Sequence, residues 1–332
     1  PAGGQTANTW WGTLNVDKRQ GVYLQDQIKI SHDVHLLAGL RYSKVTFDSQ
    51  DDVSGVFVTA FGVDPSTIRA TRSDSAVTPR LGMLWEARPG TSLYASYSEN
   101  FGNYQANFDW LNKALDPQLA KQKEIGVKQQ SADGKLSSSL AIFDIRKTNE
   151  AIVDPAHTGC RDGTMGIIGA GNPCYMAAGL TRSQGIELDL IGEVMPGWNL
   201  IANYSYNNAR ILNNGGGTGE GQRLGYYPAH MARLATTYAI RGGWKIGGGV
   251  TSMGSTDLGN TSPTQTISPG YTLYDAMASY DFRLASYKAA FQLNIKNLFD
   301  KSYLVTAQKN GAFSITPHGD LRSVLAKLKL DF

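Results

Sequence analysis

Apolar and polar residues alternate along most of the chain. Phe291, Leu293 and Ile295, for example, alternate with Gln, Asn and Lys. Because successive side chains of a β-strand point to opposite faces, this pattern predicts strands with one apolar and one polar face. It predicts about thirteen of them. These strands are expected near residues 18–31, 33–48, 77–88, 91–101, 120–131, 135–150, 182–194, 197–211, 229–241, 243–254, 270–283, 287–299 and 320–332.

Short and long connections take turns between these strands. The short ones carry turn-forming residues, as in Arg88-Pro89-Gly90-Thr91 and Met195-Pro196-Gly197. The segment 110–119 is the one helical candidate, and it lies in a long connection. Alternating connection lengths predict an all-β, up-and-down antiparallel meander with every long loop at one end. A sandwich with Greek-key crossovers does not predict that regularity.

The apolar face of such a sheet could either fill a soluble core or meet lipid. Tyr and Trp side chains gather near the predicted strand ends. In membrane barrels, these side chains form belts at the two interfaces, so their placement favours lipid. The chain contains no apolar run of the ~18 residues that a transmembrane helix requires. The aromatic residues in question are Tyr42, Trp85, Tyr97, Tyr204, Tyr206, Trp244, Tyr274, Tyr280 and Phe282.

Composition excludes several classes of protein. The chain has 31 Lys and Arg against 28 Asp and Glu, a formal charge of +3, which is too balanced for a nucleic-acid binder. Apolar residues make up 41% of the chain, which is too many for intrinsic disorder. No zinc-protease, nucleophile-elbow or phosphate-loop motif occurs, so we do not predict an enzyme.

The C-terminal end resembles a known family. From Val324 onward, apolar residues alternate up to a final Phe332, and the preceding segment reads Asn-Leu-Phe-Asp-Lys-Ser-Tyr. Together they resemble the C-terminal signature of TonB-dependent outer-membrane receptors of the ferric-siderophore type. Segments 21–27, 39–42, 78–82, 96–101, 121–128 and 183–188 resemble further motifs of that family, in its order. The signature residues are Asn297, Leu298, Phe299, Asp300, Tyr303 and Phe332.

The resemblance implies a transmembrane antiparallel up-and-down β-barrel of about 22 strands around a plug. At this strand spacing, 332 residues hold only about thirteen strands. We therefore expect residues 18–332 to be the C-terminal part of the barrel, with residues 1–17 the end of an extracellular loop. Nothing in the chain resembles the plug domain, so we expect the plug to be absent from it.

By the same resemblance, the protein is a receptor that takes up a ferric siderophore across the outer membrane of a Gram-negative bacterium. The expected partners are TonB with ExbB and ExbD, acting through missing N-terminal parts, and outer-membrane lipid and lipopolysaccharide; no nucleic acid is expected. The iron travels as a chelate, so no cofactor and no protein-bound metal are expected. Two alternatives stay open, namely a passive porin-like channel and a structural or adhesive barrel that receives phage or toxin.

Ligand-binding residues are expected in the long loops, because the family takes its ligand from outside. Aromatic rings with polar partners suit an amphipathic iron chelate. The alternative for each ring is that it packs one loop on another or belongs to the outer aromatic belt. The candidates are Tyr104, Phe108, Trp110, Tyr175, Tyr226, Tyr227 and Phe313.

Cys160 and Cys174 are the only cysteines of the chain. Together with His157 and Asp162 they could form a metal site, although so few ligands in one loop give no fixed geometry. In an oxidising compartment, two cysteines in one exposed loop are more simply explained by a disulfide. We therefore predict a Cys160–Cys174 bridge and no metal.

Overall fold

The structure is a computed structural model that describes residues 11–53, 69–102, 107–111, 113–160, 172–215, 219–225, 227–257, 267–305, 308–310, 313–315 and 317–331. Among these residues, no helix has the length and apolar character needed to cross a membrane. Thirteen strands form one sheet, and each pairs with its neighbour along the chain in antiparallel register. They are β1 (Trp11–Lys29), β2 (Val34–Val53), β3 (Arg69–Arg88), β4 (Thr91–Phe101), β5 (Leu119–Gln130), β6 (Leu136–Thr158), β7 (Pro173–Met195), β8 (Trp198–Asn213), β9 (His230–Ala239), β10 (Trp244–Met253), β13 (Tyr271–Leu284), β14 (Tyr287–Lys296) and β17 (Ser323–Asp331).

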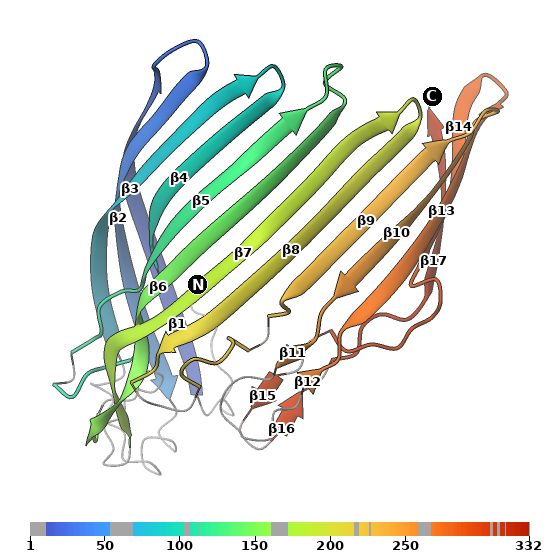
Figure 1. Cartoon of the computed structure of the whole chain (residues 1–332). Coiled ribbons are helices and arrows are strands. Elements are labelled where there is room, and N and C mark those ends of the chain that lie inside the picture. Colours follow the sequence, from blue (N-terminus) through green and yellow to red (C-terminus); the bar gives the residue numbers. More distant parts are fainter. Residues whose placement is uncertain are drawn as a thin grey trace.

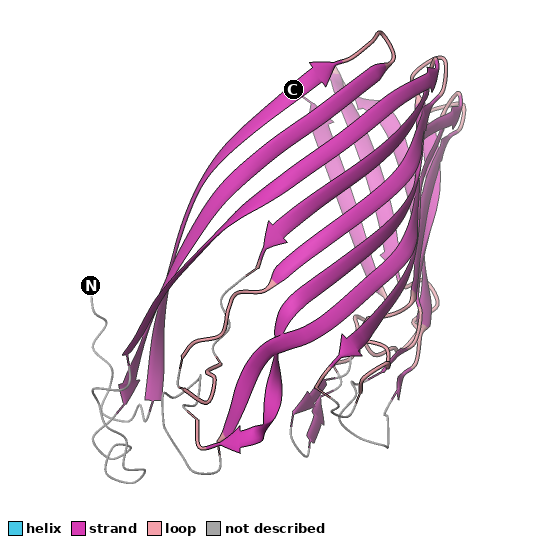
Figure 2. Ribbon diagram, turned by 60° about the vertical axis from the view of Figure 1, so that its left-hand side comes forward, coloured by secondary structure: helices cyan, strands magenta, loops and turns pink. Residues whose placement is uncertain are grey.

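The long and short connections lie at opposite ends of this sheet. In Figure 1 the short turns lie at the upper end together with the C-terminus, and the long connections lie at the lower end. Two of the long connections contain a small hairpin. One pairs β11 (Thr256–Asp257) with β12 (Ile267–Ser268), and the other pairs β15 (Gln308–Asn310) with β16 (Phe313–Ile315). Figure 2 shows that the sheet is strongly curved. The up-and-down antiparallel meander is thus confirmed.

The two faces of the sheet differ as the alternation predicts. Ile125 of β5 lies opposite Ile142 of β6, which lies opposite Ile186 of β7, and all three side chains are at least 40% exposed. Exposed apolar residues on this scale require an apolar surrounding. We call this surface the apolar face and the opposite one the polar face. Among the exceptions are Asp26 on the apolar face and the paired Ile191 and Ile201 on the polar face.

The short turns explain why the chain reverses at that end. At the turn between β7 and β8, Gly197 has a φ of 83°, a left-handed conformation that favours glycine. Its backbone N–H donates a hydrogen bond to Oε1 of Glu193 at 2.7 Å. Lys135 of the neighbouring turn places its Nζ 3.1 Å from the other carboxylate oxygen of Glu193. The carboxylate therefore connects two adjacent turns.

The strands differ from the prediction mainly at their loop ends. β1 begins at Trp11 instead of near residue 18, and β3 begins at Arg69 instead of near residue 77. β6 continues to Thr158, and β7 begins as early as Pro173. Both strands are longer than predicted because they continue to pair with each other beyond the alternating segments. In the described part of segment 110–119 the chain makes a turn and a bridge between Phe108 and Ala114, so the helical candidate is not a helix.

The signature segment after β14 forms a compact connection around Asn297, which is buried and has a φ of 49°. Its side-chain amide donates hydrogen bonds to the carbonyl oxygens of Lys301 (2.8 Å) and Asp320 (3.1 Å). Its Oδ1 accepts one from the Lys301 amide (2.9 Å), and its own amide donates to Asp275 of β13 (2.9 Å). Asn297 thereby joins three segments of chain.

The other signature residues surround this centre. The Phe299 ring meets Tyr274 of β13 edge-on at 5.3 Å, and the Tyr303 ring lies 4.4 Å from that of Tyr271. Oδ1 of Asp300 accepts a hydrogen bond from the Arg322 amide just before β17. Phe332 lies outside the described residues. The signature therefore builds the passage from β14 to the last strand.

We expect Asn297→Ala to lower the free energy of unfolding by about 2 kcal/mol, since it leaves buried polar groups unpaired and strains a positive φ. Asn297→Gly tolerates the φ but makes none of the side-chain hydrogen bonds, so it should fall between the alanine variant and the wild type. Urea unfolding of the detergent-purified protein measures this order. An alanine variant as stable as the wild type would contradict the role given to Asn297.

Candidate functional site

The candidate site lies at the long-loop end, where β6 and β7 extend beyond their neighbours. Cys160 and Cys174 form a disulfide there, with their Cα atoms 5.0 Å apart, and both side chains are fully buried. The predicted bridge is therefore confirmed. Next to it, Asn172 Nδ2 donates a hydrogen bond to the carbonyl oxygen of Cys160 at 3.2 Å, and the Gly159 amide donates to Asn172. These bonds close the hairpin around the disulfide.

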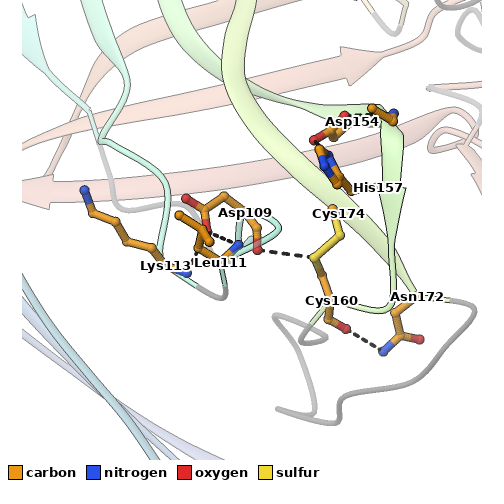
Figure 3. Close-up of a disulfide and its surroundings, with 9 residues drawn as sticks. Asp109, Leu111, Lys113, Asp154, His157, Cys160, Asn172 and Cys174 are labelled. Carbon is orange, nitrogen blue, oxygen red and sulfur yellow. Dashed lines mark hydrogen bonds and ion pairs between the residues drawn. A yellow bond between two sulfur atoms is a disulfide. The ribbon is translucent and has the colours of Figure 1, made fainter.

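A second loop packs against this hairpin, as Figure 3 shows. In the loop before β5, Oδ1 of Asp109 accepts hydrogen bonds from the amides of Leu111 (3.0 Å) and Lys113 (2.7 Å), which fixes a turn. The Asp109 carbonyl oxygen lies 3.2 Å from Sγ of Cys160. A disulfide sulfur carries no proton, so this is a close contact and not a conventional hydrogen bond. The disulfide thus lies against the backbone of the second loop.

Aromatic residues gather where the two loops meet. The Tyr175 amide donates a hydrogen bond to the carbonyl oxygen of Phe108 at 3.0 Å, so the start of β7 lies beside the loop before β5. The Trp110 indole stacks on the His157 imidazole with ring centroids 5.0 Å apart and an interplanar angle of 11°. Trp110 remains 54% exposed. We call Phe108, Trp110, His157 and Tyr175 the loop platform.

The orientation of His157 is set by a carboxylate. Its Nδ1 lies 2.7 Å from Oδ2 of Asp154, whose other oxygen accepts a hydrogen bond from the Ala156 amide at 2.9 Å. These two partners, the amide first, hold the pKa of Asp154 below its usual value. A tilted strand crosses a membrane in about 9–11 residues. Asp154 lies near the loop end of β6, well outside the part of the strand that would cross. The carboxylate therefore stays charged and holds the imidazole under the indole.

The structure brings together only some of the predicted ligand residues. Phe108, Trp110 and Tyr175 share the loop platform, whereas Tyr227 is 58% exposed in the separate connection between β8 and β9. Phe313 belongs to β16. Tyr104 and Tyr226 lie outside the described residues, so their prediction stays untested.

His157 is the residue of the platform that was not predicted as a ligand residue. From the sequence it is considered only as a possible metal ligand beside the cysteines, and its stacking partner lies 47 positions away in the sequence. Within the described parts of the chain, no group of three or more His, Cys, Asp or Glu residues is arranged to hold a metal ion. The sulfur atoms of the proposed alternative metal site are both used in the disulfide.

The polar face of the sheet also carries a hollow. It has a volume of about 590 Å³ and spans β1 to β5. Its lining includes Arg41, Arg80 and Glu124, whose Oε1 accepts a hydrogen bond from the Tyr94 hydroxyl at 2.7 Å. The polar face is thus hollowed and charged, in contrast to the apolar face.

Comparison with known proteins identifies the family. The family model described as "TonB dependent receptor-like, beta-barrel" matches residues 1–298, which is most of the chain. The chain belongs to the TonB-dependent receptor β-barrel family. This membership accounts for the thirteen-stranded meander, the hollowed polar face and the elongated loops at one end. It also confirms the resemblance that the C-terminal signature indicated.

Curated relatives include two receptors from Pseudomonas. The metal-pseudopaline receptor CntO of Pseudomonas aeruginosa is 31% identical over 93% of this chain and 40% of its own length. The ferric-pyoverdine 358 receptor of Pseudomonas putida is 28% identical over 96% of this chain and 36% of its own length. The chain therefore spans about two fifths of the length of these relatives.

Solved structures agree with this assignment. The siderophore receptor PiuA from Acinetobacter baumannii superposes with a TM-score of 0.75 at 25% identity, over 96% of this chain and 44% of that one. The ferric-catecholate import receptor Fiu from E. coli K12 superposes with a TM-score of 0.77 at 23% identity, covering 96% of this chain and 45% of its own. The likeness to Fiu supports the fold alone.

The disulfide should matter for binding more than for the sheet. The bridge joins residues 14 positions apart and holds Cys160 against the Asp109 carbonyl oxygen, so without it the ends of β6 and β7 and this contact lose order. Restoring this contact on binding costs free energy, so we expect a Cys160→Ser, Cys174→Ser double variant to bind the ferric chelate that the family resemblance implies about tenfold more weakly. Intrinsic fluorescence quenching measures this affinity. Unchanged affinity together with unchanged circular dichroism would show that the bridge does not order the site.

Proposed function

We propose that this chain is part of a TonB-dependent outer-membrane receptor that binds a ferric siderophore and admits it to the periplasm. The observation that carries the proposal is the loop platform, in which Phe108, Trp110 and Tyr175 meet at the long-loop end of a chain of this family. Names of relatives and structural neighbours, such as ferric-pyoverdine, metal-pseudopaline and siderophore receptor, support it.

In this proposal the apolar face meets the lipid of the outer membrane of a Gram-negative bacterium, and the long loops face the outside. The polar face encloses the passage, because a ligand with hydrogen-bonding groups crosses more easily along polar side chains. The sheet is a passive wall. The work comes from TonB with ExbB and ExbD, which act on parts of the receptor other than the residues of this chain.

The loop platform captures the ligand without chemistry. Indole, phenol and phenyl rings offer flat apolar surfaces, and the phenol and indole add a hydrogen-bonding group. Such rings suit an iron chelate with an organic periphery. The iron is cargo inside its chelate and is not bound by the protein, so we assign no resident cofactor and no catalytic residue.

Uptake of radioactive iron by iron-starved cells tests this function. The probes are ferric pyoverdine, a ferric catecholate and a ferric hydroxamate, given to cells that express the full-length protein, with and without TonB. We expect uptake of one class of chelate, and only when TonB is present. Entry of small solutes without TonB would instead indicate a porin-like channel. If the cells show neither uptake nor binding of a chelate, a structural or adhesive barrel is the explanation that remains.

A further inference from the structure

The hollow on the polar face holds two neighbouring arginines. Arg41 of β2 lies opposite Thr78 of β3 in the register of the sheet, and Arg80 is two residues further along β3. Residues related in this way are diagonal neighbours on one face, within reach of each other's long side chains. Both arginines line the hollow, and both are exposed. The wall of the hollow therefore carries two adjacent positive charges.

Neither guanidinium group is neutralised by an acidic side chain of the described residues. Nε of Arg41 donates a hydrogen bond to Oγ of Ser43 at 2.9 Å, and its Nη2 lies so close to Gly21 of β1 that a Cβ there would come within 2.6 Å of it. The glycine thus leaves room for the guanidinium group across β1. Arg80 makes no hydrogen bond or ion pair with the residues that the structure describes. Both groups keep their full charge.

Two carboxylates border the hollow, and both have other partners. The oxygens of Glu124 accept hydrogen bonds from the Tyr94 hydroxyl at 2.7 Å and from the Gln122 side-chain amide at 2.9 Å. Glu99 accepts a hydrogen bond from the Tyr97 hydroxyl and lies 3.4 Å from Nζ of Lys121. Among the described residues, neither carboxylate forms an ion pair with Arg41 or Arg80. The positive charge of the pair is therefore available to a ligand.

The rest of the lining suits a ligand rich in oxygen atoms. Arginine binds anionic oxygens particularly well, because its planar group donates two parallel hydrogen bonds. The hollow, at about 590 Å³, is within the size range of small-molecule sites. Hydroxyl and amide groups complete its wall, and they belong to Gln25, Thr78, Ser96, Ser98, Asn100 and Gln122.

The pair lies inside the part of the sheet that would cross the membrane. Arg80 is eight residues from the short-turn end of β3 at Arg88, and Arg41 is seven residues from the start of β2 at Val34. A tilted strand crosses the hydrocarbon layer in about 9–11 residues. The arginines therefore lie on the wall of the proposed passage, in its outer half. Surrounding lipid of low dielectric constant strengthens their attraction for an anion beyond its value in open water.

We propose that Arg41 and Arg80 form a second binding site for the transported chelate, and that this site selects ferric chelates with a net negative charge, such as a tris-catecholate complex. The inference rests on the proposed function, in which the polar face encloses the path of a chelate. Iron(III) bound by three catecholate groups is a trianion, whereas iron(III) bound by three hydroxypyridinonate groups is neutral. Only the first complex carries the charge that the arginines attract.

Uptake of these two complexes, built on the same organic backbone, by iron-starved cells that express the full-length protein tests the site. A hydrogen bond to a charged group contributes about tenfold in affinity, so the variant Arg41→Gln, Arg80→Gln should take up the charged chelate about tenfold more slowly. Binding of this chelate at the surface of cells without TonB reports on the distant loop platform and should stay within about twofold of the wild type.

Two further variants separate charge from folding. Arg41→Lys, Arg80→Lys keeps both charges and should recover most of the uptake of the charged chelate. The matched control is Arg233→Gln, Lys245→Gln, which removes equal charge from the polar face outside the hollow and should stay within about twofold of the wild type.

Three results would overturn the proposal. They are equal slowing of both chelates by the glutamine variant, which would show that the arginines support the protein and do not meet the ligand, equal uptake of both chelates by the wild type, and loss of uptake in the lysine variant as large as in the glutamine variant. Uptake of the neutral chelate alone refutes this site but not the proposed transport. If the wild type takes up no ferric chelate at all, the proposed transport fails, and this site with it.

Discussion

Replacing Leu190 with arginine should lower the stability of the folded protein in a bilayer by about 3 kcal/mol, because arginine at the bilayer midplane on a lipid-facing strand costs that much. Leu190 lies on the apolar face of β7, five residues from its short-turn end at Met195, which is halfway across the predicted span. Its register partners are Ser138 and Ala202, and neither can neutralise a cation. Urea unfolding in phospholipid vesicles measures the loss.

The matched control is Asn203→Arg at the same depth on the polar face. Asn203 lies five residues from Trp198 at the start of β8, and its register partners are Asp189 and Arg233. The Asp189 carboxylate, which already accepts a hydrogen bond from Asn203 Nδ2, offsets the repulsion between a guanidinium at this position and Arg233. We expect this variant to be close to the wild type in stability. If the control were the more destabilised of the two, the assignment of the faces would be reversed.

Trp110→Ala should weaken binding of the ferric chelate about 30-fold, the size of loss that a central aromatic residue of a binding site causes. The indole is more than half exposed, and its inner surface rests on His157, which is itself held by Asp154. The indole is therefore held in place before the ligand binds, so little side-chain entropy is lost on binding. Fluorescence or calorimetric titration with the chelate identified by the uptake experiment measures the change.

Two further variants separate binding from folding at this position. Trp110→Phe keeps a flat ring over the imidazole and should recover most of the affinity. His157→Ala removes the support but not the ligand-facing ring, so it should cause a smaller loss than Trp110→Ala. An alanine variant at position 110 with wild-type affinity would show that Trp110 packs loops together, the alternative left open for each candidate ring.

The main body of the sheet could be predicted because each of its strands has one apolar and one polar face. Alternation such as that of Phe291, Leu293 and Ile295 specifies both a strand and its orientation, and the turn residues mark where it reverses. β4 spans Thr91–Phe101, the range that alternation predicts. Membership of the TonB-dependent receptor family followed from short motifs at these same strands.

The loop end could be predicted only in part, because its order comes from contacts distant in sequence. β6 continues through Asp154 and His157 without an apolar face, held by pairing with β7 and by the disulfide. The apolar residues after Asp109 suggested a helix, but the Asp109 carboxylate accepts backbone hydrogen bonds that fix a turn instead. The disulfide was predictable since the chain has only two cysteines.

The basic residues Arg146, Arg182 and Arg210, which lie directly opposite one another on β6, β7 and β8, show the same limit. Each of them is an ordinary basic residue of a strand, and one sequence does not show that they are neighbours. Only the register of β6, β7 and β8 places them in one line. Charge clusters of this kind are therefore found from pairing and not from composition.

The most direct test of the account is to ask which face of β8 meets lipid. Spin labels placed singly at residues 200 to 205, in the full-length protein in vesicles, report their surroundings through relaxation by oxygen, which enters lipid, and by a water-soluble nickel complex. We predict that labels at Leu200, Ala202 and Tyr204 respond to oxygen, and that labels at Ile201, Asn203 and Ser205 respond to nickel. Equal responses along the strand, or the reverse alternation, would contradict a membrane-spanning sheet with its apolar face in lipid.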